Sequence, residues 1–261
     1  MIFIAGKSAD LQGLFRRYPA NGVEHACLTT LSTSRTRYDY VSVDELSFEL
    51  TLRGAIVERS ELLRRSGLQF EVFRRAYCNR RYWNRRADGG FEVRSGVSAA
   101  AAVRDIYENG RAYGTECATA MQIVYYGALL DVVSEAAFDR RFAGMRLMNW
   151  HDIAPTLREV GSMNRATDYL AGDRRYFANP DVNLQTPEWQ GENVIDLGDG
   201  TYYGHGMGRR RAAEIIAELN QNRRAARGVA TRSADGGLRS AYLMDAAGRP
   251  DFAKLYGAFG V

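Results

Sequence analysis

Lysine, cysteine and long apolar runs are all scarce in this sequence of 261 residues. The only lysines are Lys7 and Lys254, so arginine carries nearly all of the positive charge. Three cysteines are an odd number in a chain too large to need disulfide staples, which favours a reducing compartment. No run of about 20 apolar residues predicts a membrane span, and the first residues lack the basic start of a classical secretion signal. We therefore expect a protein that stays inside the cell and has no membrane partner.

Neither a nucleic-acid motif nor a metal-binding pattern accompanies the charged residues. The net charge is only +4 and the arginines are scattered along the chain, so we interpret them as solvated faces and expect no nucleic-acid partner. His25 and Cys27 stand close together, but no second ligand pair follows at zinc spacing. No aspartate-rich loop has EF-hand spacing, so we expect no requirement for calcium. The sequence thus predicts neither a metal site nor a cofactor.

Local signals divide the chain into helices, strands and connections. Ser42, followed three residues later by Glu45, is a capping box, and it opens a helix that should end at Gly67. A second helix is expected over residues 99–108. The other expectations are a strand over residues 1–5, an irregular connection over 7–40, packed loops with a short hairpin over 68–95, a strand over 145–150 that ends in Trp150 and His151, and loops with short elements over 157–179.

The stretch Tyr113–Ala120 joins a glycine-bearing loop to a segment that is apolar on nearly every face. This segment predicts a helix over residues 116–133, and a helix that is hydrophobic all round is usually central to its domain. With Thr115 as N-cap, Cys117 falls in the first turn, where free N–H groups and the helix dipole favour a thiolate. Cys117 is therefore a candidate nucleophile, and the alternative is a small buried core residue.

Two strand-like runs on either side of Asp199–Gly200 predict a β-hairpin. If these two residues form the turn, Glu192 lies opposite Met207, and His205 is its diagonal neighbour on the same face. If the loop has three residues instead, His205 moves to the other face. The hairpin therefore offers a carboxylate and an imidazole to the cysteine, and the alternative is a polar pair at a sheet end.

The chain contains several short motifs whose order along the sequence is informative. They are Arg104-Asp105-Ile106, Glu108-Asn109-Gly110, Glu116-Cys117-Ala118-Thr119-Ala120, Trp150-His151, Trp189-Gln190-Gly191-Glu192-Asn193-Val194-Ile195, His205-Gly206-Met207-Gly208 and Ser240-Ala241-Tyr242-Leu243. In these phrases the chain resembles the bacterial spore-coat transglutaminase family, from about Tyr38 to the C-terminus, and the residues before Tyr38 match less clearly. The resemblance implies one catalytic domain over residues 1–261. It also implies an α+β fold with a papain-like, NlpC-type cysteine-enzyme core, in which an antiparallel sheet packs against helices and the nucleophile stands at a helix N-terminus.

The resemblance also implies roles for individual residues. Cys117 matches the nucleophile, Glu192 its catalytic partner, Glu116 an auxiliary carboxylate and His205 a histidine near the site. The aromatic residues that match the lining of a substrate tunnel in the family are Phe70, Trp150 and Trp189. The implied activity is that of a protein-glutamine γ-glutamyltransferase, which joins glutamine and lysine side chains of proteins without calcium or another cofactor. The implied location is the cytoplasm or the spore coat of a sporulating bacterium, with spore-coat proteins as substrates.

The implied chemistry requires these residue types. Cys117 would attack a glutamine carboxamide, forming a thioester, and a buried Glu192 with a raised pKa would give a proton to the departing ammonia. Backbone N–H groups at the helix start would stabilise the oxyanion. A rival assignment makes His205 the base and Glu192 the residue that orients it. Two other functions stay open, a thiol hydrolase or amidase on the same scaffold and a non-catalytic coat or assembly protein.

Overall fold

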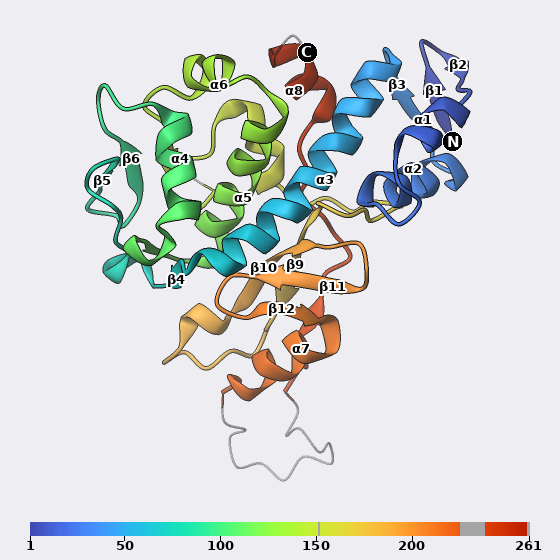
Figure 1. Ribbon diagram of the computed structural model, residues 1–261. Coiled ribbons are helices and arrows are strands. Elements are labelled where there is room, and N and C mark those ends of the chain that lie inside the picture. The colour runs from blue at the N-terminus through green and yellow to red at the C-terminus, as the bar shows by residue number, and fades with distance from the viewer. Residues whose placement is uncertain (151, 225–237, 260–261) are drawn as a thin grey trace.

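The longest helix, α3 (Val43–Ser66), crosses the middle of the fold, with helices on one side and a sheet below it (Figure 1). The computed structural model describes residues 1–150, 152–224 and 238–259. Ser42 caps α3 by accepting a hydrogen bond from the N–H of Glu45 at 3.1 Å. Gly67 ends the helix with a φ of 88°, in the left-handed region that favours glycine. Both predicted boundaries of this helix are confirmed.

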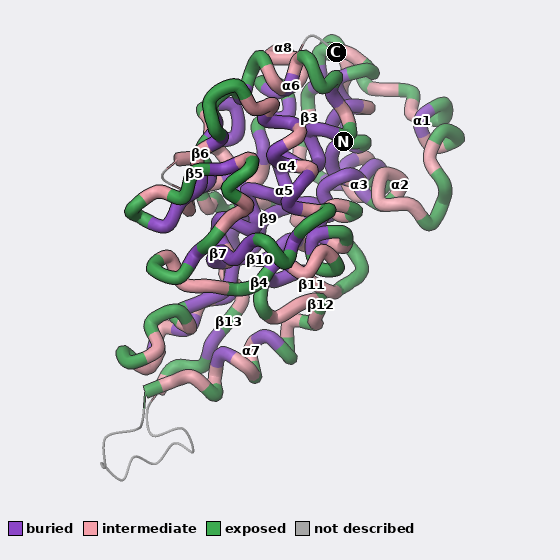
Figure 2. Tube along the Cα trace, turned by 60° about the vertical axis from the view of Figure 1, so that its left-hand side comes forward, coloured by how far each residue is buried: buried purple, intermediate pink, exposed green. Residues whose placement is uncertain are grey.

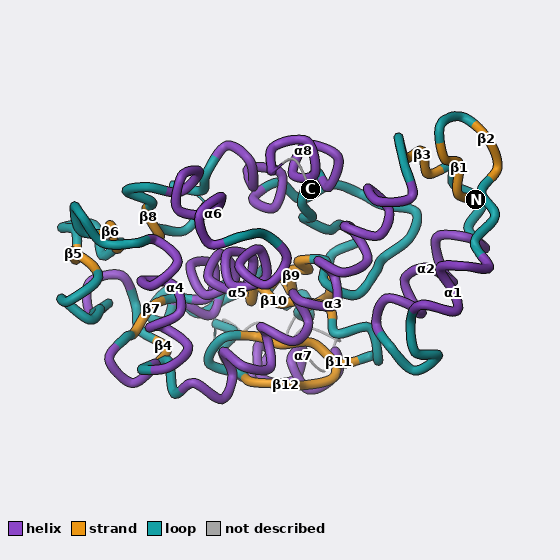
Figure 3. The backbone as a smooth tube through the Cα atoms, turned by 45° about the horizontal axis from the view of Figure 1, so that its top comes forward, coloured by secondary structure: helices purple, strands orange, loops and turns teal. Residues whose placement is uncertain are grey.

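Helix α5 (Cys117–Val132) lies at the centre of the helical layer and packs along α3 (Figure 3). Every residue from Ala118 to Leu130 is buried, as expected for a helix that is apolar on all faces (Figure 2). The helices α4 (Ala99–Glu108) and α6 (Glu135–Phe142) pack around it, and α4 has the predicted bounds. The first turn of α5 is therefore held by a rigid core.

A five-stranded antiparallel sheet packs on the other side of α5, in the order β12-β11-β10-β9-β13. Its strands are β9 (Arg174–Ala178), β10 (Gly191–Asp196), β11 (Thr201–Gly204), β12 (Gly208–Arg211) and β13 (Tyr242–Leu243). The outer face of the sheet is covered by α7 (Ala212–Gln221), below the sheet in Figure 1. Helices packed against an antiparallel sheet are the predicted α+β arrangement.

The hairpin of β10 and β11 has a three-residue loop, Gly198–Gly200, rather than the two-residue turn. Val194 lies opposite Gly204 in this register. The glycines at the two ends of the loop have φ values of 82° and 80°, which a side chain would strain. This register is the one in which His205 leaves the face of Glu192.

Shorter strands connect the main layers. β4 (Gln69–Phe70) and β7 (Gly114–Thr115) form a parallel pair next to the start of α5. β5 (Trp83–Arg85) and β6 (Phe91–Val93) form the predicted short hairpin, and β8 (Arg146–Leu147) adds a third strand to it. The strand predicted over residues 145–150 is thus only two residues long, and His151 lies outside the described residues.

The remaining helices are short. They are the 3₁₀ helices η1 (Phe73–Arg75), η2 (Gly110–Ala112), η3 (Pro155–Gly161) and η4 (Pro187–Trp189), and the α-helix α8 (Phe252–Phe259), which packs on α3. Across the described ranges, no helix combines the length and the apolar character needed to cross a membrane.

The irregular connection expected over residues 7–40 is wrong, because most of this segment is ordered into helices and strands. It contains β2 (Lys7–Ser8), α1 (Gln12–Arg17), α2 (Val23–Thr33) and β3 (Tyr38–Tyr40), and β1 (Ile2–Ile4) pairs with both of these strands. Cys27 and Leu28 of α2 belong to the same buried cluster as Leu46 and Leu50 of α3. Tertiary burial therefore stabilises helices whose sequence pattern is weak.

The short elements expected among the loops over residues 157–179 include a strand, β9, which the sequence pattern does not specify. It begins with Arg174 and Arg175, which are both buried, so the sequence lacks the alternation of apolar and polar residues by which strands are recognised. β9 pairs with β10 over five residue positions, from Arg174 opposite Ile195 to Ala178 opposite Gly191. Its place beside β10 brings its side chains to the start of α5.

Candidate active site

Cys117 is the first residue of α5, and Glu116 rather than Thr115 caps the helix. The Glu116 carboxylate accepts hydrogen bonds from the N–H groups of Ala118, at 2.6 Å, and Thr119, at 2.7 Å. It also accepts one from the Thr119 hydroxyl. A carboxylate at this position satisfies two N–H groups that the helix leaves free and complements the helix dipole. The sulfur of Cys117 thus stands beside a bound carboxylate.

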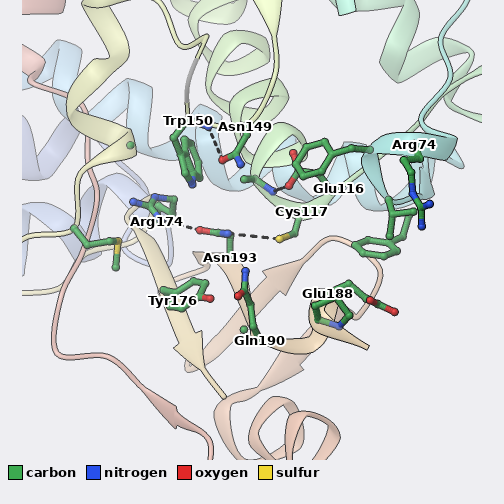
Figure 4. A pocket seen from close by; sticks show the side chains of 18 of the residues that line it. Arg74, Glu116, Cys117, Asn149, Trp150, Arg174, Tyr176, Glu188, Gln190 and Asn193 are labelled. Carbon is green, nitrogen blue, oxygen red and sulfur yellow. Dashed lines mark hydrogen bonds between the residues drawn. The ribbon is translucent and has the colours of Figure 1, made fainter. Parts of the chain in front are cut away.

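Cys117 opens into a cavity of about 1230 Å³ between the start of α5, η1 and strands β9 and β10 (Figure 4). The other predicted residues that line the cavity are Glu116, Phe70 and Trp150. Asn149 holds Trp150, because its Oδ1 accepts the Trp150 N–H at 2.6 Å. The Asn149 N–H in turn donates to the hydroxyl of Thr119 at 2.8 Å. A chain of hydrogen bonds therefore links the cap of α5 to an aromatic wall of the cavity.

Asn193 and Arg174 approach the sulfur from the sheet (Figure 4). The Nδ2 of Asn193 donates to the Sγ of Cys117 at 3.5 Å, and its Oδ1 accepts a hydrogen bond from Nη1 of Arg174 at 2.7 Å. Sequence reasoning missed both as site residues. Asn193 stands next to Glu192 in the family phrase, which is a usable signal, whereas Arg174 begins the strand that the pattern does not predict.

Glu192 is buried in β10 and acts on the thiol through its charge. Strand alternation turns its neighbour Asn193 toward the cavity, and Glu192 does not belong to the lining. Its Oε1 has no hydrogen-bond partner among the residues that the structure describes. Burial, and then the nearby Glu116 carboxylate, raise the pKa of Glu192 well above its usual range. Glu192 is therefore a carboxyl group that takes up a proton more readily than an exposed glutamate does.

The pKa of the Cys117 thiol is raised as well, so the helix start does not by itself produce the expected thiolate. Burial is the largest cause, followed by the charges of Glu192 and Glu116, and the Asn193 hydrogen bond opposes them. The carboxylate cap also occupies two of the N–H groups that would otherwise favour a thiolate. The charge of Glu192 and the charge of a Cys117 thiolate therefore disfavour each other.

His205 directs its imidazole toward β4 rather than toward Glu192. Its Nε2 lies 3.1 Å from the carbonyl oxygen of Gln69, and since a carbonyl only accepts, this nitrogen carries the proton. Burial lowers the pKa of His205 to about 4, so the ring is neutral near pH 7. Only the backbone N–H of His205 faces Glu192, where it opposes the rise in the pKa of that carboxyl. His205 does not belong to the lining of the cavity into which Cys117 opens.

The structure brings two of the three predicted aromatic residues to the cavity, Phe70 and Trp150. Trp189 packs instead against the buried cluster on the outer face of the sheet, which includes Phe177 and Ile215. Its neighbours Glu188 and Gln190 line the cavity. Trp189 therefore lies one residue away from the lining, on the opposite side of its loop.

Comparison with known proteins connects this site to a family. A sequence profile described as protein-glutamine gamma-glutamyltransferase matches residues 1–259. This chain belongs to the protein-glutamine γ-glutamyltransferase family. A protein of that name from Bacillus cereus (strain B4264) is 43% identical over 196 residues, which are 75% of this chain and 70% of the relative. Another from Bacillus mycoides (strain KBAB4) is 42% identical, with the same coverage of both chains.

A solved structure shows the same fold. The transglutaminase from Geobacillus stearothermophilus, without its C-terminal extension, matches with a TM-score of 0.75 and 40% identity, over 84% of this chain and 98% of that chain. Bacterial transglutaminases have the papain-like cysteine-enzyme fold, so the predicted fold class is confirmed. The profile match also includes the residues before Tyr38, where the resemblance is less clear. The chain is a transglutaminase, a transferase that cross-links glutamine and lysine side chains of proteins.

Proposed function

We propose that this transglutaminase transfers the glutamyl group through a thioester on Cys117. The position of the sulfur supports this most, because it lies at the first residue of α5 and opens into the cavity of about 1230 Å³. Attack of the sulfur on the glutamine carboxamide forms the C–S bond, and loss of the protonated nitrogen breaks the C–N bond and releases ammonia. A lysine amine then attacks the thioester carbon, and the sulfur leaves.

Glu192 is the group that we assign to proton transfer. As a carboxylate it takes the proton of the Cys117 thiol, and as an acid it gives that proton to the departing nitrogen. In the second half-reaction it takes a proton from the attacking amine and returns it to the sulfur. A pKa raised by burial suits a carboxyl group that must donate as well as accept. His205 is the weaker of the two rival candidates, because its ring is bound to a carbonyl and neutral.

Glu116 has two roles in this proposal, as the cap of α5 and as an auxiliary carboxylate beside the sulfur. Its hydrogen bonds occupy the N–H groups of Ala118 and Thr119. The N–H of Cys117, which precedes them in the first turn, is therefore the backbone donor that we assign to the oxyanion of the tetrahedral intermediate. The sequence predicts that several N–H groups at the helix start stabilise the oxyanion, and we now assign this role to the N–H of Cys117 alone.

Phe70 and Trp150 form the walls that we assign to the substrate. Aromatic walls exclude the water that would hydrolyse a thioester, and their faces attract a lysine ammonium by about 0.5–2 kcal/mol. For Trp189 we propose an indirect role. Its packing on the outer cluster, and the hydrogen bond of 3.0 Å from Asn179 to its carbonyl, hold the loop whose residue Glu188 lines the cavity.

Calcium independence and location in the cytoplasm or the spore coat are further parts of the proposal. They rest on the missing EF-hand pattern and on the family resemblance. Within the described residues, no cluster of three or more His, Cys, Asp and Glu side chains could hold a metal ion. Unchanged activity in a chelator, and recovery of the protein with spore-coat proteins after fractionation of spores, would support these two statements separately.

Labelled-amine incorporation into a glutamine-rich protein, measured together with ammonia release, tests the proposed function. A transferase produces both in equal amounts, and Cys117→Ala loses both. Cys78→Ala is the matched control, because Cys78 is another partly buried cysteine but does not line the cavity. Ammonia without amine incorporation would indicate a hydrolase or amidase instead. An inactive protein that self-associates stably would indicate a coat or assembly role.

A further inference from the structure

Arg174 is a buried arginine without a carboxylate partner. Its exposed fraction is 2%, and no carboxylate of the described residues lies within ion-pair distance of its guanidinium. The other two buried arginines of this region are paired, Arg53 with Glu49 and Asp173, and Arg175 with Asp196. A buried charge without a partner is strongly unfavourable, so its retention needs a reason.

Neutral groups hold the Arg174 guanidinium in place beside the cavity. Its Nε donates to the carbonyl of Val160 at 2.7 Å, its Nη1 donates to Oδ1 of Asn193 at 2.7 Å, and its Cζ lies 4.4 Å from the ring centroid of Trp150. Its Nη2 has no hydrogen-bond partner in the described ranges. Figure 4 shows Arg174, Asn193 and Cys117 in one line, with Trp150 over the guanidinium. The positive charge therefore reaches the sulfur through one amide.

This line of groups fixes the orientation of the Asn193 amide. Only the oxygen of an amide accepts a hydrogen bond from a guanidinium, so Oδ1 must face Arg174 and Nδ2 must face Cys117. The reversed amide would place an oxygen lone pair against the sulfur and repel a thiolate. The cation also polarises the amide, which strengthens the N–H bond to a negative sulfur.

The surroundings of the sulfur explain why such a cation is useful. Glu116 and Glu192 both place negative charge near Cys117 and both disfavour its thiolate. No other cationic side chain among the described residues is hydrogen-bonded to a group that contacts the sulfur. Arg174 thus opposes two carboxylates from the side of the sheet.

We propose that Arg174 is a positioning residue of the transglutaminase, which orients and polarises Asn193 so that the Cys117 sulfur is stabilised as a thiolate. The inference rests on the proposed role of Cys117 as the nucleophile. Arg174 does not touch the substrate's reacting atoms in this account, and its effect passes through Asn193. Loss of Arg174 therefore lowers the reactivity of the sulfur without a change in the affinity for the protein substrate.

The rate at which Cys117 reacts with iodoacetamide, followed on the Cys117 peptide across a range of pH, tests the proposal without any substrate. In Arg174→Met the alkylation rate at mildly alkaline pH falls between about threefold and tenfold, because a charge-assisted hydrogen bond is weakened. The pH profile of alkylation moves upward, and kcat for amine incorporation falls with KM nearly unchanged. Arg174→Lys, which can still donate to Oδ1 of Asn193, restores part of the rate.

Two further variants separate this role from a structural one. Arg175→Met removes the neighbouring buried arginine, whose Nε donates to the carbonyl of Ala246 at 3.0 Å, and should leave the alkylation profile unchanged. The double variant of Arg174→Met and Asn193→Ala should react no more slowly than Asn193→Ala alone, because both changes break one line of interaction.

An alkylation profile of Arg174→Met that coincides with the wild-type profile would overturn the proposal, and so would additive effects in the double variant. If Arg174→Met does not fold, an Asn193→Ala variant with wild-type alkylation would overturn it equally. The two proposals fail in different ways. If Arg174→Met shifts the alkylation profile as expected but the wild-type protein incorporates no amine, the proposed function is contradicted. The role of Arg174 is then still supported.

Discussion

At the scale of single residues, the two carboxylates beside the sulfur differ in what binds them. Glu116 accepts hydrogen bonds from two backbone N–H groups and a hydroxyl, which favour its charged form. Glu192 has an oxygen without a partner among the described residues, and burial favours its protonated form. Burial raises the pKa of both carboxyl groups, but the hydrogen bonds of Glu116 oppose the rise, whereas the pKa of Glu192 lies well above its usual range. We therefore assign Glu116 to capping the helix and Glu192 to proton transfer.

Replacement of Glu192 by Gln should move thiol reactivity and turnover in opposite directions. The Glu192 charge raises the pKa of the Cys117 thiol, so its removal lowers that pKa, and alkylation of Cys117 should become faster at a given pH. Amine incorporation should fall by about 10²–10⁴-fold, because the proton donor to ammonia is lost. Alkylation kinetics and steady-state incorporation measure the two effects. A parallel fall in both would indicate damage to the site rather than loss of an acid.

Replacement of His205 by Gln should preserve activity and change the acid stability of the fold. The pKa of His205 is about 4 in the folded protein and about 6.5 when unfolded, so between these values the unfolded state binds more protons. The free energy of unfolding therefore falls as pH decreases through this window, by up to about 3 kcal/mol from this group. The Gln variant can still donate to the carbonyl of Gln69, but it lacks this pH-dependent contribution to the free energy of unfolding.

Urea unfolding of the wild type and His205→Gln, at several pH values within that window, measures the difference. The expected result is a flatter pH dependence in the variant, together with amine incorporation close to that of the wild type. Loss of incorporation with an unchanged acid dependence of stability would instead favour His205 as the catalytic base.

At the scale of elements, the parts that sequence reasoning recovered have strong local signals. A capping box and a closing glycine mark α3, an amphipathic run marks α4, and an apolar run marks α5. The parts that it missed depend on contacts between distant segments. α1 and α2 are stabilised by packing near α3, and β9 opens with two arginines that only the neighbouring carbonyls and side chains make tolerable. The sequence could not predict Arg174 as a site residue for the same reason, whereas motifs predicted Cys117 and Glu192.

The register of a hairpin also limited what the sequence could predict. A loop of two residues and a loop of three residues are both compatible with the glycines around Asp199, and they place His205 on different faces. The observed three-residue loop, and the carbonyl of Gln69 on another strand, decide where the imidazole lies. No pattern within the hairpin contains this information.

Two arginines of α3 allow a matched test of how this helix ties the fold together. Arg53 is buried and binds Glu49 at 2.8 Å and Asp173 at 3.0 Å, which connects α3 to the segment before β9. Arg59 pairs with Asp131 near the surface. Arg53→Met should lower the free energy of unfolding by about 3–5 kcal/mol, because the buried Glu49 carboxylate loses its ion pair and Asp173 keeps only the one with Arg249. Arg59→Met should lower it by about 0–1 kcal/mol.

Urea unfolding of both variants at neutral pH measures these changes. One shared transition for the whole chain is the expected result, because we propose that residues 1–261 form a single domain in which the N-terminal segment shares α3 with the helical layer. Separate transitions in Arg53→Met, or equal losses in the two variants, would contradict this account of α3.

At the scale of the whole molecule, the scarcity of lysine bears on an enzyme that seeks amines. Lys7 is exposed in β2, while the Lys254 ammonium donates to the carbonyl of Pro155 at 2.6 Å and binds Glu159 at 2.9 Å. Exposed glutamines such as Gln190 are present and could act as acyl donors. The supply of lysine amines, which are the acyl acceptors, therefore limits self-cross-linking. Our hypothesis is that the composition limits self-cross-linking; a general preference for arginine codons is the alternative.

The active enzyme incubated alone should therefore form few covalent oligomers. Those that form should pass through Lys7 and disappear in Lys7→Arg, as seen by denaturing electrophoresis and mass spectrometry of the cross-linked peptides. Introducing lysines at exposed arginine positions should increase the yield of oligomers. Suitable variants are Arg74→Lys, at the cavity, and Arg80→Lys, away from it. Abundant oligomers in the wild-type protein would contradict the hypothesis.

The central claim is that a glutamyl group resides on Cys117 during transfer. The most direct measurement mixes the enzyme with a glutamine-containing protein in the absence of any amine, quenches with acid, and determines the mass of the Cys117 peptide. The expected result is an adduct on Cys117 whose mass equals that of the substrate segment less ammonia, and which an added primary amine discharges. An adduct on another residue, or amine incorporation that persists in Cys117→Ala, would contradict it.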